Sequence, residues 1–464
     1  MIETLSMPQL NYNAQANPYL GPPGTATMHG DAQASDCTPL AGPGAGAWDI
    51  TSVDLGGACP TILVGNDGFI QVLTTQRFGR DLTFLQPKIS ILDPGGAVMS
   101  SLEIPKGALL GAVYAYVDNH NRMVVADGTG TLIRVAHDAT GRGLHVDQRA
   151  DVSSFLSHTP GDQIVGLTPD WQGRVWLASR EGRVAMIDEN LREVRGLVLN
   201  RFNGAGERVD NSISSAPEGV SIITNRGMYL LNAPAGQPQI VWATAYDAGS
   251  HRKPGKLAWG SGASPTFFGP NGSDYLMLTD NGDFQEAVEV YNTKTGRKLG
   301  SGKLFMPNAS GSENSMIGIG NTIIAACTYG YPYPRYPEGA GPSTPAKALF
   351  APGFERWDLT PRGLRNVWRR TDMYSSAVPR YSAADGLIYT CERPRGPLGL
   401  LDGTSIKAVA VDINTGQTVH EQTLPGLVTL FGVDTLQMVG TIDTHGTWWQ
   451  GTIGGVFRIS RKGA

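Results

Sequence analysis

The sequence predicts an all-β fold, a single closed β-propeller, and three observations lead to this fold class. Residues 262–330 hold four short apolar or alternating runs separated by Gly, Asn, Asp and Pro turns, the pattern of a four-stranded antiparallel meander. Similar units recur about every fifty residues along the chain. The 464 residues include 60 Gly and 30 Pro, only 17% are charged, and no long amphipathic helical run is present.

This repeat accounts for the chain in order. Residues 1–47 are rich in Pro, Gly and Asn and predict an extended arm over one face, and WDITSV (48–53) is a single strand. Seven four-stranded units follow, whose first strands are TILVG (61–65), AVYAYVD (112–118), IVGLTPD (164–170), SISSAP (212–217), SPTFFG (264–269), SMIGIG (315–320) and VPRYSA (378–383). The last unit, from LQMVGTID (436–443), has only three strands. Residues 48–53 supply the fourth, which predicts eight blades over 48–464 and a ring closed by the two chain ends. Seven blades is the alternative if one end unit is irregular.

The composition excludes several classes of function. A net charge of −4 gives no basic field for nucleic acid, and no run of eighteen apolar residues predicts insertion into a membrane. No signal peptide is visible at the N-terminus, so a cytoplasmic protein and a mature secreted or periplasmic form both stay open.

Cys37 and Cys59 flank a loop that a disulfide would close, whereas Cys327 and Cys391 end apolar strands and are expected to be buried free thiols.

The geometry of a propeller selects candidate site residues. When the strands of each blade are called A (innermost) to D, the D–A and B–C loops open on one face, so the starts of A and the ends of B converge on the central tunnel. The expected A starts include Gln163, Asn211, Ser212, Ser264, Glu313, Asn314, Ser315 and Asp434. The expected B ends include Asp127, Arg180, Asn225, Arg226, Asp280, Asn281, Tyr329, Glu392 and Arg393.

Five of these residues form a candidate oxygen-rich cluster that would hold a metal ion: Asn211, Asp280, Asn281, Glu313 and Asn314. Carboxylate and amide oxygens are the ligands that Ca²⁺ prefers, which predicts a calcium site at the tunnel mouth. The alternative is that the Asn and Ser side chains cap turns and that TDNG (279–282) is a hairpin turn.

Three long loops on the same face, 74–87, 328–353 and 392–404, predict a substrate wall or lid. The predicted substrate-binding residues are Tyr329, Tyr331, Tyr333, Arg393 and Asp434. On the arm, His29 and Asp31 would form a catalytic acid–base pair if the arm folds over the tunnel. The alternatives are a cover without a ligand and a histidine on a surface loop.

The eight-blade count and the segments YNTKTGRKL (291–299) and VDINTGQTV (411–419) resemble the strand–turn–strand repeats of quinoprotein-dehydrogenase-like propellers. This resemblance implies a quinone-dependent alcohol or sugar dehydrogenase. The docking tryptophans of that family are mostly absent here, as are its adjacent cysteine pair and its haem motif. Pyrroloquinoline quinone is therefore not expected as a cofactor.

The five candidate metal ligands are similar in residue type and predicted placement to the calcium site of gluconolactonases, paraoxonases and strictosidine-synthase-like propellers, which normally have six blades. This second resemblance implies a Ca²⁺-dependent lactone or ester hydrolase acting on a small organic molecule, with His29 or Asp31 as base. A non-enzymatic propeller that binds a protein or glycan partner is the third hypothesis. The sequence leaves the oligomeric state open.

Overall fold

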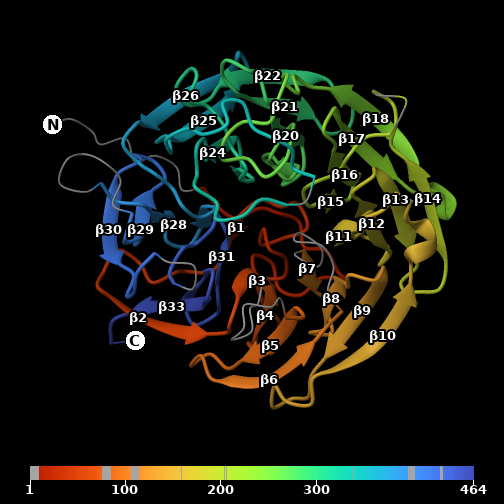
Figure 1. Ribbon diagram of the computed structural model, residues 1–464, viewed down its shortest axis with the longest axis horizontal. Coiled ribbons are helices and arrows are strands. Elements are labelled where there is room, and N and C mark those ends of the chain that lie inside the picture. The colour runs from red at the N-terminus through yellow and green to blue at the C-terminus, as the bar shows by residue number, and fades with distance from the viewer. Residues whose placement is uncertain are drawn as a thin grey trace.

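Eight four-stranded units stand in a ring around a central axis in the computed structural model (Figure 1). The structure describes residues 10–463 except 76–84, 106–113, 158, 203, 205, 338, 396–402 and 429–431. The prediction of an all-β, eight-bladed propeller is confirmed. Parts of the predicted long loops 74–87 and 392–404 lie outside the described residues.

The first four blades follow the chain. Blade 1 comprises β3 (Ala58–Val64), β4 (Ile70–Thr75), β5 (Lys88–Leu92) and β6 (Val98–Glu103). Blade 2 comprises β7 (Ala115–Val117), β8 (Met123–Ala126), β9 (Thr131–Ala136) and β10 (His145–Asp151), and η1 (Ser153–Phe155) follows it. Blade 3 comprises β11 (Ile164–Pro169), β12 (Val175–Ser179), β13 (Arg183–Ile187) and β14 (Val194–Val198). Blade 4 comprises β15 (Ser214–Ala216), β16 (Gly219–Ile223), β17 (Gly227–Asn232) and β18 (Gln239–Ala245), with η2 (Pro234–Gly236) before β18.

The remaining blades complete the ring. Blade 5 comprises β19 (Thr266–Phe268), β20 (Tyr275–Thr279), β21 (Ala287–Asn292) and β22 (Lys298–Lys303). Blade 6 comprises β23 (Ile317–Ile319), β24 (Thr322–Ala326), β25 (Phe354–Thr360) and β26 (Gly363–Arg370). Blade 7 comprises β27 (Arg380–Ser382), β28 (Leu387–Glu392), β29 (Lys407–Asp412) and β30 (Thr418–Thr423), and β1 (Cys37–Thr38) adds a fifth, parallel strand to it. Blade 8 comprises β31 (Gly440–Ile442), β32 (Trp448–Gly451), β33 (Gly455–Arg461) and β2 (Trp48–Asp54).

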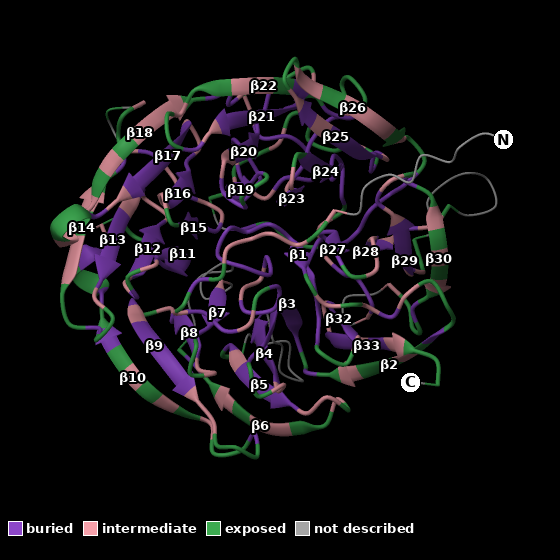
Figure 2. Ribbon diagram, turned by 180° about the vertical axis from the view of Figure 1, so that it is seen from behind, coloured by how far each residue is buried: buried purple, intermediate pink, exposed green. Residues whose placement is uncertain are grey.

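Burial follows the position of a strand in its blade. Every residue of β3 and β4 is buried, because both faces of an inner strand pack against neighbouring blades. The outermost strands β10 and β30 alternate between exposed and covered positions, because one face and one edge meet solvent. Figure 2 shows the same change from buried centre to exposed rim in each blade. The core is therefore a ring of contacts between blades, which is why the repeat needs closure.

The two ends of the chain close the ring. Strand β2 pairs antiparallel with β33, from Trp48 opposite Arg461 to Asp54 opposite Gly455. The predicted closure by pairing of the N- and C-terminal strands is confirmed. It removes the open edge that a row of blades would otherwise present.

The N-terminal arm lies along one face and then enters the tunnel. Near its start, the side chain of Asn13 donates to the carbonyl of Gly269, in the hairpin after β19. Further along, the arm is bonded to the innermost strands of six blades. Its backbone accepts hydrogen bonds from the N–H groups of Val64, Val117, Ser215, Phe267, Gly318 and Tyr381. The arm thus fills the tunnel rather than only covering a face, and it carries its polar side chains into the centre of the ring.

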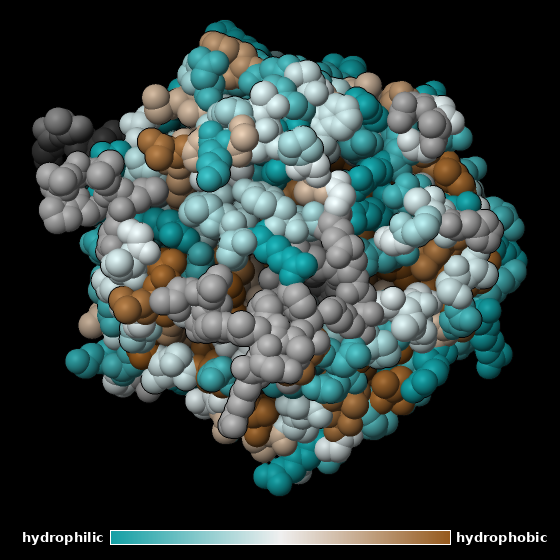
Figure 3. Space-filling view, viewed as in Figure 1, coloured by the Kyte–Doolittle hydropathy of each residue, from teal (hydrophilic) through white to brown (hydrophobic). Residues whose placement is uncertain are grey.

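All four cysteines are free and buried, so Cys37 and Cys59 are not joined by a disulfide. Cys37 pairs with blade 7 and Cys59 lies in blade 1, on different parts of the ring. Within the described part of the chain, no helix has the length and apolar character needed to cross a membrane. From the viewpoint of Figure 1, hydrophobic side chains form small scattered groups among hydrophilic ones (Figure 3).

Candidate functional site

A cavity of about 140 Å³ lies at the mouth of the tunnel, where the first strands of the blades begin. On the tunnel side, the arm lines the cavity with Met28 and His29. On the opposite side, the long 328–353 segment covers it with Tyr333, Pro334, Arg335 and Pro337. The blades contribute the remaining lining: Ala58, Pro60, Thr75, Tyr114, Asn211, Leu257, Gly262, Ser264, Glu313, Ser315, Val378, Leu436, Gln437, Met438 and Val439. Most of these side chains are apolar, so the few polar groups among them define the chemistry of the site.

Ser264, His29 and Asp36 form a hydrogen-bonded chain beside this cavity. The Oγ atom of Ser264 lies 3.1 Å from Nε2 of His29, and Nδ1 of His29 lies 3.0 Å from Oδ1 of Asp36. Ser264 and His29 both line the cavity, whereas Asp36 is completely buried behind them. This is the connectivity of a nucleophile, a general base and an orienting carboxylate.

Further contacts fix the orientation of the chain. Ser315 donates its hydroxyl hydrogen to Oδ2 of Asp36, and its Oγ lies 3.0 Å from Nδ1 of His29. Because a carboxylate only accepts, Nδ1 of His29 carries the hydrogen and Nε2 presents its lone pair to Ser264. The hydroxyl of Ser212 is hydrogen-bonded to that of Ser264. Nε2 of His29 is therefore the acceptor that would remove the proton of the Ser264 hydroxyl.

The arm holds this geometry with an unusual backbone. Ala34 and Asp36 have φ values of +55° and +54°, which side chains other than glycine adopt only under constraint from their surroundings. The guanidinium of Arg380 is completely buried, donates to the carbonyl of Met28 at 2.6 Å, and lies 3.8 Å from Oδ1 of Asp36. Gly30 has φ +91°, and a Cβ there would lie 2.4 Å from Nη1 of Arg380. Glycine is therefore required beside His29.

Glu313 adds a carboxyl group to the polar part of the cavity lining. Its Oε2 atom is buried and has no hydrogen-bond partner among the described residues. Burial raises the pKa of this carboxyl to about 8, against the lowering effects of Lys256 and of a hydrogen bond from the backbone N–H of Leu257. The group is thus mostly protonated at neutral pH. Tyr333, whose pKa is raised by burial and by Glu313, also has a buried hydroxyl with no partner in the part of the chain that the structure describes.

The predicted catalytic pair needs correction. His29 does line the cavity, but its carboxylate partner is Asp36 and not Asp31. Asp31 accepts hydrogen bonds from the backbone N–H of Ser35 at 3.0 Å and from the hydroxyl of Tyr12 at 3.1 Å. Burial raises the pKa of Asp31 to about 6. Asp31 shapes the turn of the arm and is not among the described residues that line the cavity.

The five predicted metal ligands are engaged separately. Only Asn211 and Glu313 line the cavity, and Asn211 donates its amide to the carbonyl of Ser261. Asn314 donates to Oε1 of Gln437. Across the described residues, no group of three or more His, Cys, Asp or Glu is placed to hold a metal ion. Calcium binding stays a prediction that this arrangement does not support.

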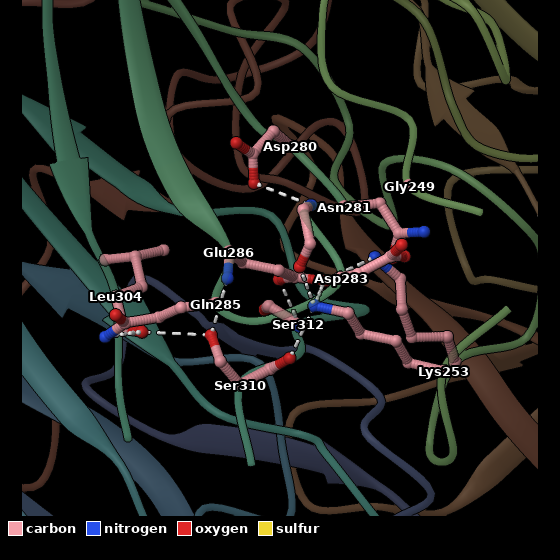
Figure 4. Close-up of polar contacts among 12 residues, drawn as sticks. Gly249, Lys253, Asp280, Asn281, Asp283, Gln285, Glu286, Leu304, Ser310 and Ser312 are labelled. Atoms are coloured by element: carbon pink, nitrogen blue, oxygen red, sulfur yellow. Dashed lines mark hydrogen bonds and ion pairs between the residues drawn. The ribbon is translucent and has the colours of Figure 1, made fainter. Parts of the chain in front are cut away.

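Asp280 and Asn281 lie instead in a structural network of blade 5 (Figure 4). Asp280 accepts backbone hydrogen bonds from Gly282 and Ala287, and Asn281 donates to the carbonyls of Ala248 and His251. Both side chains thus hydrogen-bond to the backbone around the turn, as in the alternative reading of TDNG as a hairpin turn.

The same region is held by buried charges. Lys256 donates to Glu286 at 2.9 Å, and Lys253 donates to the carbonyls of Gly282 and Ser310. Desolvation lowers the pKa of Lys253, although Glu286 opposes this effect. The network fixes the connection from blade 4 to blade 5, which leads directly to Ser264.

Of the predicted substrate-binding residues, only Tyr333 lines the cavity. The hydroxyl of Tyr331 donates to Asp434 at 2.5 Å, and Arg393 donates to the same carboxylate at 2.7 Å. The guanidinium of Arg393 also lies over the ring of Tyr331, 5.1 Å from its centre. Tyr329 packs into the apolar core between blades 5 and 6. These residues brace the 328–353 segment and do not contact the cavity.

The sequence pattern places Ser264 and Ser315 at the tunnel mouth without a role, whereas it does not single out Asp36 or Arg380. The signal for Asp36 was available, since His29 and Asp36 stand seven residues apart in one polar arm segment. What the sequence did not reveal was the path of the arm, which turns back so that the Asp36 N–H donates to the His29 carbonyl at 2.9 Å.

Pyrroloquinoline quinone, the cofactor of the first family resemblance, is a planar tricyclic tricarboxylate. A cavity of about 140 Å³ is smaller than ligand pockets of roughly 300–1,000 Å³. Its described lining contains no tryptophan and a single guanidinium, that of Arg335. The described residues in this arrangement do not fit the cofactor, and its absence from the protein stays a prediction.

Comparison with known proteins shows the fold and not a family. No protein-family model matches the chain. An uncharacterized protein of Archaeoglobus fulgidus is 22% identical over 314 residues, and the match spans 61% of this chain and 60% of that protein.

Among solved structures, quinohemoprotein alcohol dehydrogenase from Comamonas testosteroni is 10% identical with a TM-score of 0.59, over 94% of this chain and 80% of that one. A europium-containing methanol dehydrogenase is 12% identical with a TM-score of 0.55, over 94% and 98%. BamB from Moraxella catarrhalis is 13% identical with a TM-score of 0.51, over 89% and 98%. The chain is thus an eight-bladed propeller whose structural neighbours include quinoprotein dehydrogenases.

Proposed function

We propose that this protein hydrolyses a small ester or lactone at the tunnel mouth, with Ser264 as nucleophile, His29 as general base and Asp36 as the orienting carboxylate. The observation that carries the proposal is the pair of hydrogen bonds, 3.1 Å and 3.0 Å, that link the three side chains beside a cavity. The arm supplies two of the three residues, so the site exists only in the assembled propeller.

In the first half of the reaction, Nε2 of His29 accepts the proton of the Ser264 hydroxyl as Oγ attacks the carbonyl carbon. Asp36 holds the Nδ1–H and stabilises the imidazolium that forms. The tetrahedral adduct then expels the alcohol oxygen, which takes the proton from Nε2. In a lactone this hydroxyl stays attached to the acyl chain, which is now esterified to Ser264.

In the second half, water replaces the alcohol. Nε2 removes a proton from the water, the oxygen attacks the acyl carbon, and the bond to Oγ of Ser264 breaks. The proton passes from Nε2 back to Ser264, and a carboxylic acid leaves. The enzyme returns to its starting state with one water consumed.

The test combines covalent labelling with turnover. A fluorophosphonate reagent should modify Ser264, as located by peptide mass spectrometry, and the protein should hydrolyse 4-nitrophenyl acetate or a small lactone. Ser264→Ala should abolish both. Ser90→Ala is the matched control, since Ser90 is also a buried serine, its hydroxyl is hydrogen-bonded to that of Ser101 in blade 1, and it is not part of the described cavity lining. A wild-type protein that is neither labelled nor active on any of these esters would refute the proposal.

A quinone-dependent alcohol or sugar dehydrogenase is the second candidate, favoured by the fold shared with two dehydrogenases. It predicts that added pyrroloquinoline quinone and Ca²⁺ confer alcohol-dependent reduction of a redox dye. Dye reduction that survives Ser264→Ala, without ester hydrolysis, would replace the first proposal by this one.

A further inference from the structure

Two residues that line the cavity each carry a buried polar atom that has no hydrogen-bond partner among the described residues. The hydroxyl of Tyr333 and Oε2 of Glu313 are both buried, and neither makes a hydrogen bond within the described residues. Buried polar atoms are paired in the great majority of cases, so two unpaired groups on residues that line one cavity call for an explanation. A bound ligand that accepts hydrogen bonds supplies it.

We infer that Tyr333 and Glu313 donate hydrogen bonds to the carbonyl oxygen of the ligand, and that this ligand is an uncharged ester or lactone of about one ring. The inference rests on the proposed function and assigns the donors that would stabilise the tetrahedral adduct, because attack by Ser264 places negative charge on the carbonyl oxygen. Donors in a water-excluded site stabilise such charge strongly.

The size and polarity of the cavity define the ligand class. A volume of about 140 Å³ is close to that of an engineered protein cavity, roughly 150 Å³, that binds benzene. The wall is mainly aliphatic, with Met28, Leu257, Val378 and Met438 among its members. An anionic ligand would meet only one cationic side chain on the described wall, Arg335, and a cationic ligand would meet a protonated Glu313. An uncharged acceptor suits both donors.

The protonation of Glu313 is set by its surroundings. Burial dominates, and the charges that act on it come from three neighbouring elements. The charged and titratable groups facing it are Lys256, Asp210, Glu286, Tyr114 and Tyr333. Lys256 lowers the pKa while Asp210 and Glu286 raise it, and the outcome is a pKa of about 8. The carboxyl hydrogen is therefore available below pH 8 and is lost above it.

Cyclohexanone, which has the ring and the carbonyl but no leaving group, is the probe. Isothermal titration calorimetry should show that it binds Ser264→Ala at pH 7 and that binding weakens as the pH rises through about 8. Glu313→Gln, which keeps an N–H donor at every pH, should bind without this pH dependence. Glu313→Ala and Tyr333→Phe should each weaken binding about tenfold. Tyr333→Phe in the otherwise native protein should lower kcat for ester hydrolysis about 10²-fold.

Tyr336→Phe is the matched control, because Tyr336 lies in the same segment with an exposed ring against Arg252 and outside the cavity. Cyclohexanone binding that is unchanged in Glu313→Ala and Tyr333→Phe would overturn the inference, even if Ser264 is labelled. Binding that requires both groups, in a protein that never labels at Ser264, would leave the ligand site standing and remove the hydrolase. No binding of cyclohexanone to Ser264→Ala would also overturn the inference.

Discussion

His29 is the residue whose surroundings determine the chemistry, because both of its ring nitrogens have partners. Nδ1 faces Asp36 and Ser315, and Nε2 faces Ser264. A carboxylate beside Nδ1 fixes the hydrogen there and leaves Nε2 free to accept. An asparagine would offer an N–H group instead and would favour the opposite tautomer.

Asp36→Asn should therefore lower kcat by a factor on the order of 10⁴ while the fold is kept. Ester hydrolysis measures the effect, and circular dichroism checks the fold. Ser315→Ala removes a donor to Asp36 without changing the tautomer, and its kcat should fall much less. Equal losses in both variants would mean that the network only positions the arm.

Asp31 makes stability depend on pH. Because burial raises its pKa from 3.8 to about 6, the folded state favours the protonated carboxyl. Its contribution is complete below pH 3.8 and is lost as the pH rises to 6. Asp31→Asn stays neutral, so the Tm of the native protein should fall relative to that of Asp31→Asn between pH 4 and pH 6.5. Parallel melting curves across this range would show that Asp31 is not buried as described.

At the scale of elements, the 328–353 segment is held by an internal ion pair. Asp434 and Arg393 are both more than nine-tenths buried, and Oδ2 of Asp434 lies 2.7 Å from Nη2 of Arg393. Both contact Tyr331, whose hydroxyl donates to Asp434 and whose ring lies under the Arg393 guanidinium. Tyr333, Pro334, Arg335 and Pro337 of the same segment cover the cavity. The brace thus determines how firmly the cavity is closed.

Asp434→Ala should destabilise the protein by about 3–5 kcal/mol, because it leaves the Arg393 charge buried and unpaired. Tyr331→Phe removes one hydrogen bond and should cost about 1–2 kcal/mol. Denaturant unfolding followed by tryptophan fluorescence measures both. If Asp434→Ala were no worse than Tyr331→Phe, the ion pair would be exposed in solution and the segment would not be braced.

The elements were predictable from the sequence and the side-chain partners were not. The same order of apolar runs and turns recurs in each blade, so the strands of one blade support the assignment of those in the next. This repeat places Ser264 at the start of a first strand. Asp280 carries the same local signal, yet its carboxylate is used by the hairpin that contains it. Tyr331 and Tyr333 stand two residues apart, and only the packing around them decides that one braces and the other lines the cavity. The arm lies outside the blade repeat, so the repeat could not predict its path through the tunnel.

At the scale of the whole molecule, residues 10–54 connect the ring twice. Strand β2 closes it at the rim, and the arm closes it at the axis through six blades. Both links join segments that are far apart in sequence. Deformation of the ring would therefore disturb the contacts of His29 and Asp36 together with those of the rim.

The arm should consequently unfold with the ring and not before it. The amides of Ser215, Phe267, Gly318 and Tyr381 donate to the arm, so they exchange with deuterium only when the arm leaves the tunnel. Hydrogen exchange followed by mass spectrometry should give these inner strands the same slow rates as the buried strand β21 (Ala287–Asn292) of blade 5. Exchange in the inner strands that is a hundredfold faster would show that the arm opens independently. His29 would then leave Ser264 in that open state, and labelling of Ser264 would depend on the fraction of protein that is closed.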